Sequence, residues 1–173
     1  MDTKFSTGKT FDANAPKLKK MMADLRSHWK IRMYWLSKLP SLFFWRARVE
    51  KVSLEECSIS IPNRWATRNP FGSTYFAALA GVAEFSTGML SSFYIVGRGR
   101  ISMYVTNFEM QYQKRALGRT TFTCKDGTQI AATIDKALDS GEGQSVTALA
   151  VGRNESGEVI AEARITWSFK EKG

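Results

Sequence analysis

The chain has 173 residues, which is enough for one domain with a full hydrophobic core and a terminal extension. Its formal net charge is +9, and residues 1–51 account for +8 of it, so the basic character belongs to the N-terminal part and not to the nearly neutral body. This balance, without a recognisable binding module, argues against nucleic acid as a partner. Cys57 and Cys124 are too few for a disulfide framework or a metal site, and the N-terminus lacks a signal-peptide core, so we expect a reduced, cytoplasmic protein.

Residues 1–46 form a predicted basic helical extension. Apolar residues within it recur at spacings of three and four, which predicts one amphipathic helix that ends before Pro40. The stripe consists of Leu18, Met22, Leu25, Trp29, Met33 and Leu36. One interpretation is that it packs on the protein's own body or on a sister subunit. The other is that it docks on an anionic membrane surface or an acidic carrier protein, which the surrounding Lys and Arg favour.

The body, residues 47–173, opens with a predicted strand from Val52 to Ile61 that contains one irregularity near Glu55. A loop at residues 69–74 follows, with Pro70 and Gly72 as breakers, and then an apolar run at residues 75–95. A helix starting near Thr74 fits this run, with Ser73 or Thr74 as its cap. Free N–H groups at such a start stabilise an oxygen that becomes anionic.

Glu84 is the only charged residue in the apolar run at residues 75–95. A carboxylate inside an apolar helix costs several kcal/mol unless it is partnered or used, and desolvation by its neighbours should raise its pKa. A transmembrane helix is an alternative, but the polar residues in the middle of the run favour a core helix buried under a sheet. Glu84 is then either a hydrogen-bonded structural group or a general base.

The rest of the chain has the pattern of an antiparallel sheet. Residues 101–112 predict a long strand with a bulge near Asn107, residues 119–124 another strand, and residues 128–138 a short helix. Residues 145–153 and 159–169 predict a hairpin. One long helix with mostly consecutive strands predicts the α+β class, in which an antiparallel sheet wraps around the central helix.

The segment from Asn69 to Glu84, with the sequence NPFGSTYFAALAGVAE, resembles the loop and central helix of hotdog-fold acyl-CoA thioesterases, especially the phenylacetate-pathway type. The spacing between the Asn and the carboxylate is that of the family, and residues 108–119 and 154–167 resemble its later strands. The resemblance covers roughly residues 47–170 and is closest to a thioesterase-like branch without an assigned reaction. It implies a hotdog fold for the body and leaves the basic N-terminal helical extension unexplained.

The resemblance also implies roles for individual residues. Glu84 matches the catalytic carboxylate, which acts as general base or nucleophile, and Asn69 matches the residue that positions water or substrate. Tyr75 stands where the family often has His, and Phe76 stands at the Gly whose N–H polarises the thioester oxygen. In these proteins two subunits share each site, so a homodimer or a dimer of dimers is implied, with Asn69 of one chain facing Glu84 of the other.

Substrate contacts are expected from Gly72, Ser73, Thr74 and Thr87, and from Lys114 and Arg115, which could bind the phosphates of coenzyme A. Solvated surface is the alternative interpretation of the two cations. Coenzyme A would be part of the substrate, and no separate cofactor or metal is expected.

His28 is the only histidine and lies in the extension, which leaves the body without the base of a Ser-His-Asp or Cys-His arrangement and without a zinc site. A carboxylate must therefore carry any chemistry. Two hypotheses remain: a thioesterase acting on acyl-CoA or an acyl carrier protein, and a non-catalytic protein that binds acyl-CoA or a fatty acyl group. The spacing of Asn69 and Glu84 favours the first, and Tyr75 with Phe76 in place of His-Gly favours the second.

Overall fold

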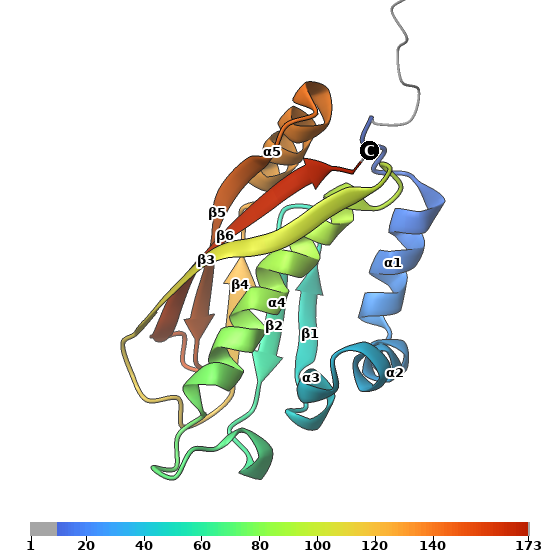
Figure 1. Ribbon diagram of the computed structural model, residues 1–173. Helices are drawn as coiled ribbons and strands as arrows, with labels where there is room; N and C mark the ends of the chain where they lie inside the picture. The colour runs from blue at the N-terminus through green and yellow to red at the C-terminus, as the bar shows by residue number, and fades with distance from the viewer. Residues whose placement is uncertain (1–9, 173) are drawn as a thin grey trace, which may run out of the picture.

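A single six-stranded antiparallel sheet wraps around one long helix in the computed structural model, which describes residues 10–172 (Figure 1). The order of the strands across the sheet is β1-β2-β4-β5-β6-β3. The strands are β1 (Arg48–Val52), β2 (Cys57–Ile61), β3 (Ile101–Tyr112), β4 (Thr120–Cys124), β5 (Gln144–Arg153) and β6 (Val159–Glu171). This arrangement confirms the α+β prediction.

The central helix, α4 (Phe76–Ile95), carries the apolar run predicted from the sequence. It is long and apolar enough to cross a bilayer, but 67% of its most apolar stretch is buried, as expected for a core helix packed on a sheet. Its cap differs from the prediction: Tyr75 occupies the N-cap position without a side-chain hydrogen bond. The hydroxyl of Thr74 instead donates to the carbonyl of Ala116 (3.2 Å), which anchors the loop before α4 to the loop after β3.

The described part of the N-terminal extension contains three helices, α1 (Pro16–Arg26), α2 (His28–Lys38) and α3 (Pro40–Phe44). The prediction of one continuous helix was wrong, because Ser27 adopts an extended conformation with ψ of 107° and turns the chain. A helix end before Pro40 is confirmed, because α2 ends at Lys38, and α3 begins at Pro40 itself. The first nine residues of the predicted extension lie outside the described part of the chain.

The break at Ser27 changes which side chains face the body. Leu18 and Leu25 of α1 are buried as the apolar stripe predicts, but α2 buries Ile31 and Trp35, which do not belong to the stripe. The Trp35 ring packs edge-on against Phe85 of α4, with centroids 5.7 Å apart. The extension therefore shares the core of the body, and the second half of the predicted stripe faces outward.

Residues 52–61 do not form the single irregular strand that we expected: residues 53–56 form a turn between β1, which ends at Val52, and β2, which begins at Cys57. β1 and β2 pair antiparallel, with Val52 opposite Cys57. The hydroxyl of Ser53 accepts hydrogen bonds from the N–H groups of Glu55 and Glu56 (both 3.1 Å), so a side chain closes the turn. The sheet therefore has two strands, β1 and β2, where the hydrophobic pattern predicted one.

The second half of the chain follows the prediction. β3 pairs with β6 along its whole length, and the register shifts between Val105 and Asn107, where the bulge was expected. The helix α5 (Gly127–Ser140) connects β4 to β5, and β5 and β6 form the predicted hairpin. No strand in the described part of the chain pairs with the outer edge of β3, and most residues of β3 are exposed.

Candidate active site

Asn69 organises the loop that precedes α4. Its Oδ1 accepts hydrogen bonds from the N–H groups of Phe71 (3.0 Å) and Ser73 (3.2 Å), and its Nδ2 donates to the Ser73 hydroxyl (3.0 Å). Gly72 has a φ of +81°, a conformation in which a side chain would be strained. Asn69 and Gly72 thus shape the loop from within, and both side-chain polar groups of Asn69 are occupied by that task.

The segment after β3 holds this loop in place. The N–H of Thr74 donates to the carbonyl of Ala116 (2.8 Å), and the guanidinium of Arg115 donates to the carbonyl of Phe71. Lys114 forms an ion pair with Glu158 (2.5 Å), which lowers the pKa of that carboxyl. The two cations expected near coenzyme A are therefore beside the loop, and both remain largely exposed.

A groove of about 370 Å³ opens between the loop, the start of α4 and the end of β3. Six of the residues predicted from the sequence line it: Asn69, Ser73, Thr74, Phe76, Lys114 and Arg115. Leu79, Tyr112, Gln113 and Ala116 complete the lining. The structure therefore brings together two segments that are some forty residues apart in the chain.

The first residues of α4 present an aromatic cluster at this groove. The rings of Tyr75 and Phe76 contact each other edge-on (4.8 Å between centroids), and Phe76 contacts Tyr112 in the same manner (6.3 Å). The N–H of Tyr75 donates to the carbonyl of Thr67 (2.7 Å) and is not available to an oxyanion. Phe76 is the first helical residue, where an N–H has no acceptor within the helix, so it retains the donor expected at this position.

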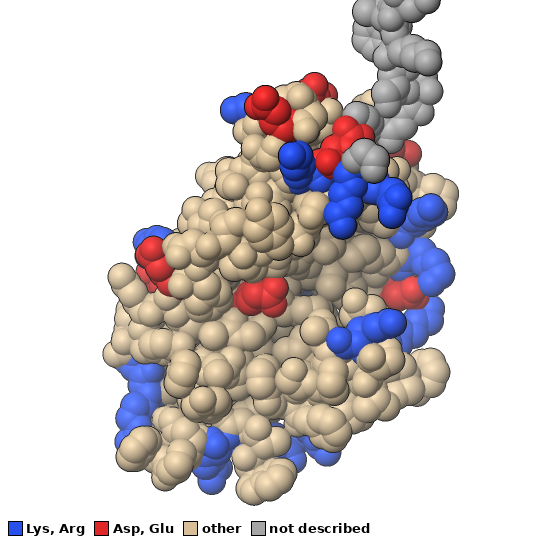
Figure 2. All heavy atoms as spheres, in the orientation of Figure 1, with Lys and Arg blue, Asp and Glu red and all other residues tan. Residues whose placement is uncertain are grey.

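Glu84 lies two turns further along α4 and does not line this groove. Glu84 follows Phe76 by eight positions in the helix, which corresponds to a rise of about 12 Å, well beyond hydrogen-bond reach. Within one chain, the loop of Asn69 and the carboxylate are therefore separate. Figure 2 shows that the face over α4 and β3 carries few charged groups.

The Glu84 carboxylate is partly buried, and burial raises its pKa. No hydrogen bond or ion pair reaches it from any other side chain in residues 10–172. A partly buried carboxylate without a partner is uncommon in protein cores, because its desolvation is not offset. The raised pKa brings this group closer to the range of a general base at neutral pH.

Gly88 and Trp167 form the wall beside Glu84, which sequence reasoning missed. A Cβ atom at Gly88 would lie 2.9 Å from Cζ2 of Trp167 and 3.5 Å from Oε1 of Glu84. The indole N–H of Trp167 donates to the hydroxyl of Thr87 (2.9 Å), which in turn donates to the carbonyl of Glu84 (3.0 Å). Thr87 has no exposed surface, and its hydroxyl holds Trp167 in place. The substrate contact expected from Thr87 stays a prediction. A glycine inside a buried helix was the available signal for this close packing.

A family model described as a domain of unknown function, DUF4442, matches residues 28–169. The chain belongs to the DUF4442 family. No curated protein matches the sequence. The match includes α2 and α3, so part of the basic extension lies within the DUF4442 region, and α1 is the one described helix that precedes it.

Solved structures similar to this DUF4442 chain include a protein of unknown function from Pseudomonas aeruginosa, described as a probable thioesterase. It is 17% identical, with a TM-score of 0.69, and the alignment covers 84% of this chain and 97% of that one. A thioesterase from Haemophilus influenzae is 12% identical, with a TM-score of 0.62 and coverage of 84% and 91%. At these identities the likeness shows the fold, which is the thioesterase-like hotdog fold.

A thioesterase from Staphylococcus aureus is 15% identical to the DUF4442 chain, with a TM-score of 0.56 and coverage of 75% and 97%. Two altered forms of that protein have been solved. In one a glutamine is replaced by alanine, and in the other a glutamate fifteen positions later is replaced by alanine.

Proposed function

We propose that this DUF4442 protein hydrolyses a thioester of coenzyme A or of an acyl carrier protein, with Glu84 as the general base. The observation that carries the proposal is the partly buried Glu84 carboxylate, which has no partner in residues 10–172 and has a raised pKa. The spacing of Asn69 and Glu84 supports it, because the two replaced residues of the S. aureus thioesterase are also fifteen positions apart. An unpartnered carboxylate is costly to fold, so a catalytic use explains its presence.

The active site is completed by a second copy of the chain. The rise of about 12 Å between Phe76 and Glu84 prevents the two halves from meeting within one chain. β3 is a free sheet edge with the exposed apolar side chains Tyr104, Phe108 and Tyr112, which an isolated soluble protein would normally protect. Pairing of two such edges forms a homodimer, in which the loop of one subunit faces Glu84 of the other.

The proposed reaction proceeds in two steps. Glu84 takes a proton from water, and the hydroxide forms a bond to the thioester carbon, whose oxygen becomes anionic and accepts a hydrogen bond from the N–H of Phe76. The bond between carbon and sulfur then breaks, and the thiolate receives the proton that Glu84 holds. The products are a carboxylic acid and a free thiol, and the Glu84 carboxylate is restored.

The phosphate groups of a coenzyme A or carrier-protein substrate need cationic partners at the mouth of the groove. Lys114 and Arg115 line it and are exposed, and the planar guanidinium of Arg115 suits a phosphate. The ion pair of Lys114 with Glu158 is solvent-exposed and therefore weak enough to exchange for a phosphate. The separation of these cations from the apolar face over α4 matches a substrate with an anionic head and an apolar acyl group.

Phe76 favours a second candidate function, the binding of acyl-CoA or a fatty acyl group without hydrolysis. Its side chain is 56% exposed at the groove, where it can cover the N–H at the start of α4. If the ring limits access, the Phe76→Gly variant should hydrolyse thioesters faster than the wild type. Equal rates would mean that the ring does not hinder the oxyanion site.

Thioester hydrolysis can be measured by the release of free thiol from acyl-CoA substrates of increasing chain length, including an aromatic acyl group. We expect Glu84→Gln to lower the rate at least about a hundredfold, which is the usual loss when a general base is removed. The exposed Glu142 provides a control, because Glu142→Gln removes a carboxylate far along the chain in the turn after α5. Wild-type turnover in Glu84→Gln overturns the mechanism, and no turnover of any substrate with saturable acyl-CoA binding favours the second function.

The two-subunit site has its own test. Asn69→Ala disrupts the loop of its own chain, and Glu84→Gln removes the base, so each homodimer should be inactive. Mixed dimers of the two variants contain one site with an intact loop and an intact base, and part of the activity should return. If mixing restores nothing although mixed dimers form, the site lies within one chain.

A further inference from the structure

The helix α2 is apolar on two opposite sides. Ile31 and Trp35 face the body and are only 5% and 1% exposed. On the other side, Trp29, Met33 and Leu36 recur at spacings of four and three and are 72%, 38% and 44% exposed. A surface helix of a globular protein normally has one apolar side, so a second one needs an explanation. The exposure of these three side chains means that nothing in the described part of the chain covers the outward side of α2.

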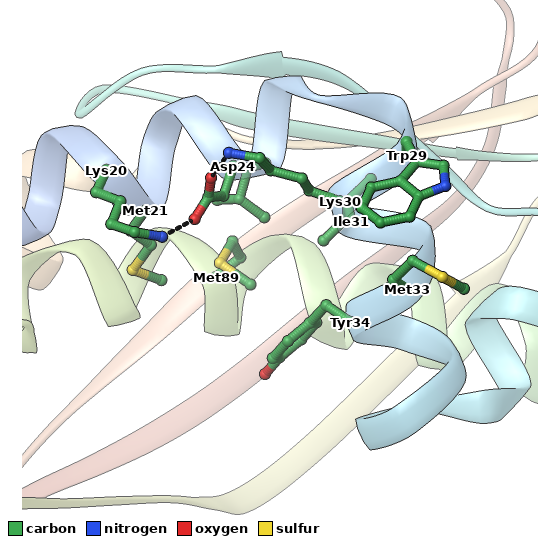
Figure 3. Close-up of a pocket in the computed structure, with 10 residues that line it drawn as sticks. Lys20, Met21, Asp24, Trp29, Lys30, Ile31, Met33, Tyr34 and Met89 are labelled. Carbon is green, nitrogen blue, oxygen red and sulfur yellow. Dashed lines mark hydrogen bonds and ion pairs between the residues drawn. The ribbon is translucent and has the colours of Figure 1, made fainter.

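The neighbouring helix α3 exposes a further apolar side chain, Phe44, which is 64% exposed. We call Trp29, Met33, Leu36 and Phe44 the docking face. Trp29 and Met33 also line a groove of about 470 Å³ between α1, α2 and α4, shown in Figure 3, so the apolar surface continues inward from the docking face. Such a continuous patch normally marks an interaction site.

Positive charge surrounds the docking face. Residues 16–49 contain nine Lys or Arg and a single acidic residue, Asp24, which binds Lys20 (2.5 Å) and Lys30 (2.7 Å) at the groove (Figure 3). On the helical wheel, Lys30 and Arg32 flank the stripe of α2 on its two sides. Figure 2 shows Lys and Arg gathered along the side of the molecule where α1 and α2 lie.

These features fit one kind of occupant, an anionic lipid bilayer. A helix with Trp and aliphatic residues on one side and Lys and Arg around them lies in the lipid interface, with its apolar side among the headgroups and its cations on the lipid phosphates. A second copy would bring the same positive charge to the contact and be repelled. An acidic protein would complement the positive charge of the lysines and arginines, but the exposed indole of Trp29 is typical of a membrane interface.

We propose that α2 and α3 dock the protein on anionic membranes through Trp29, Met33, Leu36 and Phe44, with the surrounding lysines and arginines on lipid phosphates. The proposal does not depend on the reaction at Glu84. It assigns a function to the outward half of the apolar stripe, which the core does not use.

Binding of the full chain to vesicles tests the proposal. Vesicles of phosphatidylcholine with phosphatidylglycerol should bind the protein at least tenfold more tightly than vesicles of phosphatidylcholine alone, and salt should weaken the binding. The Trp29→Ser, Leu36→Ser double variant should lose at least tenfold in affinity. The matched control is the Trp65→Ser, Leu117→Ser double variant, because these side chains are 91% and 63% exposed outside the docking face.

The charge contribution is tested in the same assay. Replacing Lys30 and Lys38 of α2 by Gln should weaken binding roughly fivefold per cation, whereas the same change at the exposed Lys125 and Lys136 should have little effect. All four double variants alter exposed side chains, and an unchanged thermal melt confirms that each is folded.

Three results overturn the proposal. The first is wild-type vesicle binding in both the Trp29→Ser, Leu36→Ser variant and the variant without the two lysines. The second is the absence of vesicle binding together with binding of a purified acidic carrier protein that requires Trp29. The third is that the wild type does not bind vesicles and the Trp29→Ser, Leu36→Ser variant forms a smaller oligomer than the wild type. That result would identify the docking face as a contact between subunits.

Discussion

Replacing Glu84 by Gln should stabilise the protein at neutral pH and leave its stability unchanged in acid. The carboxylate has no partner in residues 10–172, and burial raises its pKa above the ordinary value. Gln keeps the shape of the side chain and remains neutral, so the comparison isolates the cost of the charge. The same substitution is expected to lower the rate of hydrolysis at least about a hundredfold, so stability and activity should change in opposite directions.

The sign follows from proton linkage. Below the ordinary glutamate pKa of about 4.3, the folded and unfolded states both hold the proton and the charge costs nothing. As the pH rises through the ordinary pKa toward the raised one, the unfolded state loses its proton first and stability falls; above the raised pKa the loss is complete. An unpaired buried polar group costs about 1–3 kcal/mol, and because Glu84 is only partly buried we expect the lower end, about 1 kcal/mol.

Thermal unfolding of the wild type and of Glu84→Gln measures this difference. About 1 kcal/mol corresponds to a Tm about 2–4 °C higher for the variant near pH 8 in a domain of this size, with no difference near pH 4. Glu142→Gln serves as the control, with the same Tm as the wild type at both pH values. A wild type that is as stable as Glu84→Gln, or more stable, near pH 8 would refute the reasoning and indicate that a partner group reaches the carboxylate in the assembled protein.

Two further predictions concern packing and thiol chemistry. Gly152→Ala places a methyl group 2.6 Å from the Phe122 ring, and the overpacking should lower the free energy of unfolding by about 1–3 kcal/mol, seen as a lower Tm. In the control Gly143→Ala, the added methyl group meets nothing within 4 Å, so the Tm should not change. Equal Tm values for the two variants would contradict this reasoning. Burial raises the pKa of both the Cys57 and Cys124 thiols to about 12. Neither thiol should therefore react with a thiol reagent at neutral pH until the protein unfolds. Rapid labelling of the native protein would contradict the buried environment of these thiols.

The long helices and strands could be predicted from the sequence because proline and glycine residues mark their ends. Pro70 and Gly72 precede α4, and Gly97 and Gly99 separate it from β3. The turn at Ser53 was missed because it contains no glycine or proline and is closed by a hydroxyl group. The break at Ser27 was missed for a similar reason, because no glycine or proline marks it. The apolar spacing continues across the break as it would in one helix, although only the first half of the apolar stripe is buried.

The candidate site was predictable to the extent that it is local in the chain. The loop of Asn69 is one contiguous segment, so its composition indicated both its bends and its place before α4. The wall beside Glu84 depends on Trp167, which bonds to a hydroxyl 80 positions away, and no spacing within one segment reveals such a contact. Whether Asn69 serves the reaction also could not be inferred, because its turn-forming role requires the same residue type.

The two edges of the sheet differ in a way that limits how the chain can assemble. At one edge, α1 lies beside the short strand β1, and Arg26 donates a hydrogen bond to the carbonyl of Val52 (3.0 Å) (Figure 1). At the other edge, no strand within residues 10–172 pairs with the outer side of the twelve residues of β3. Because α1 lies beside the β1 edge, β3 offers the longer edge for strand pairing with another copy. Once two copies meet at β3, each keeps the short strand β1 beside α1 at its other edge, and such a short edge disfavours growth into fibrils by sheet extension.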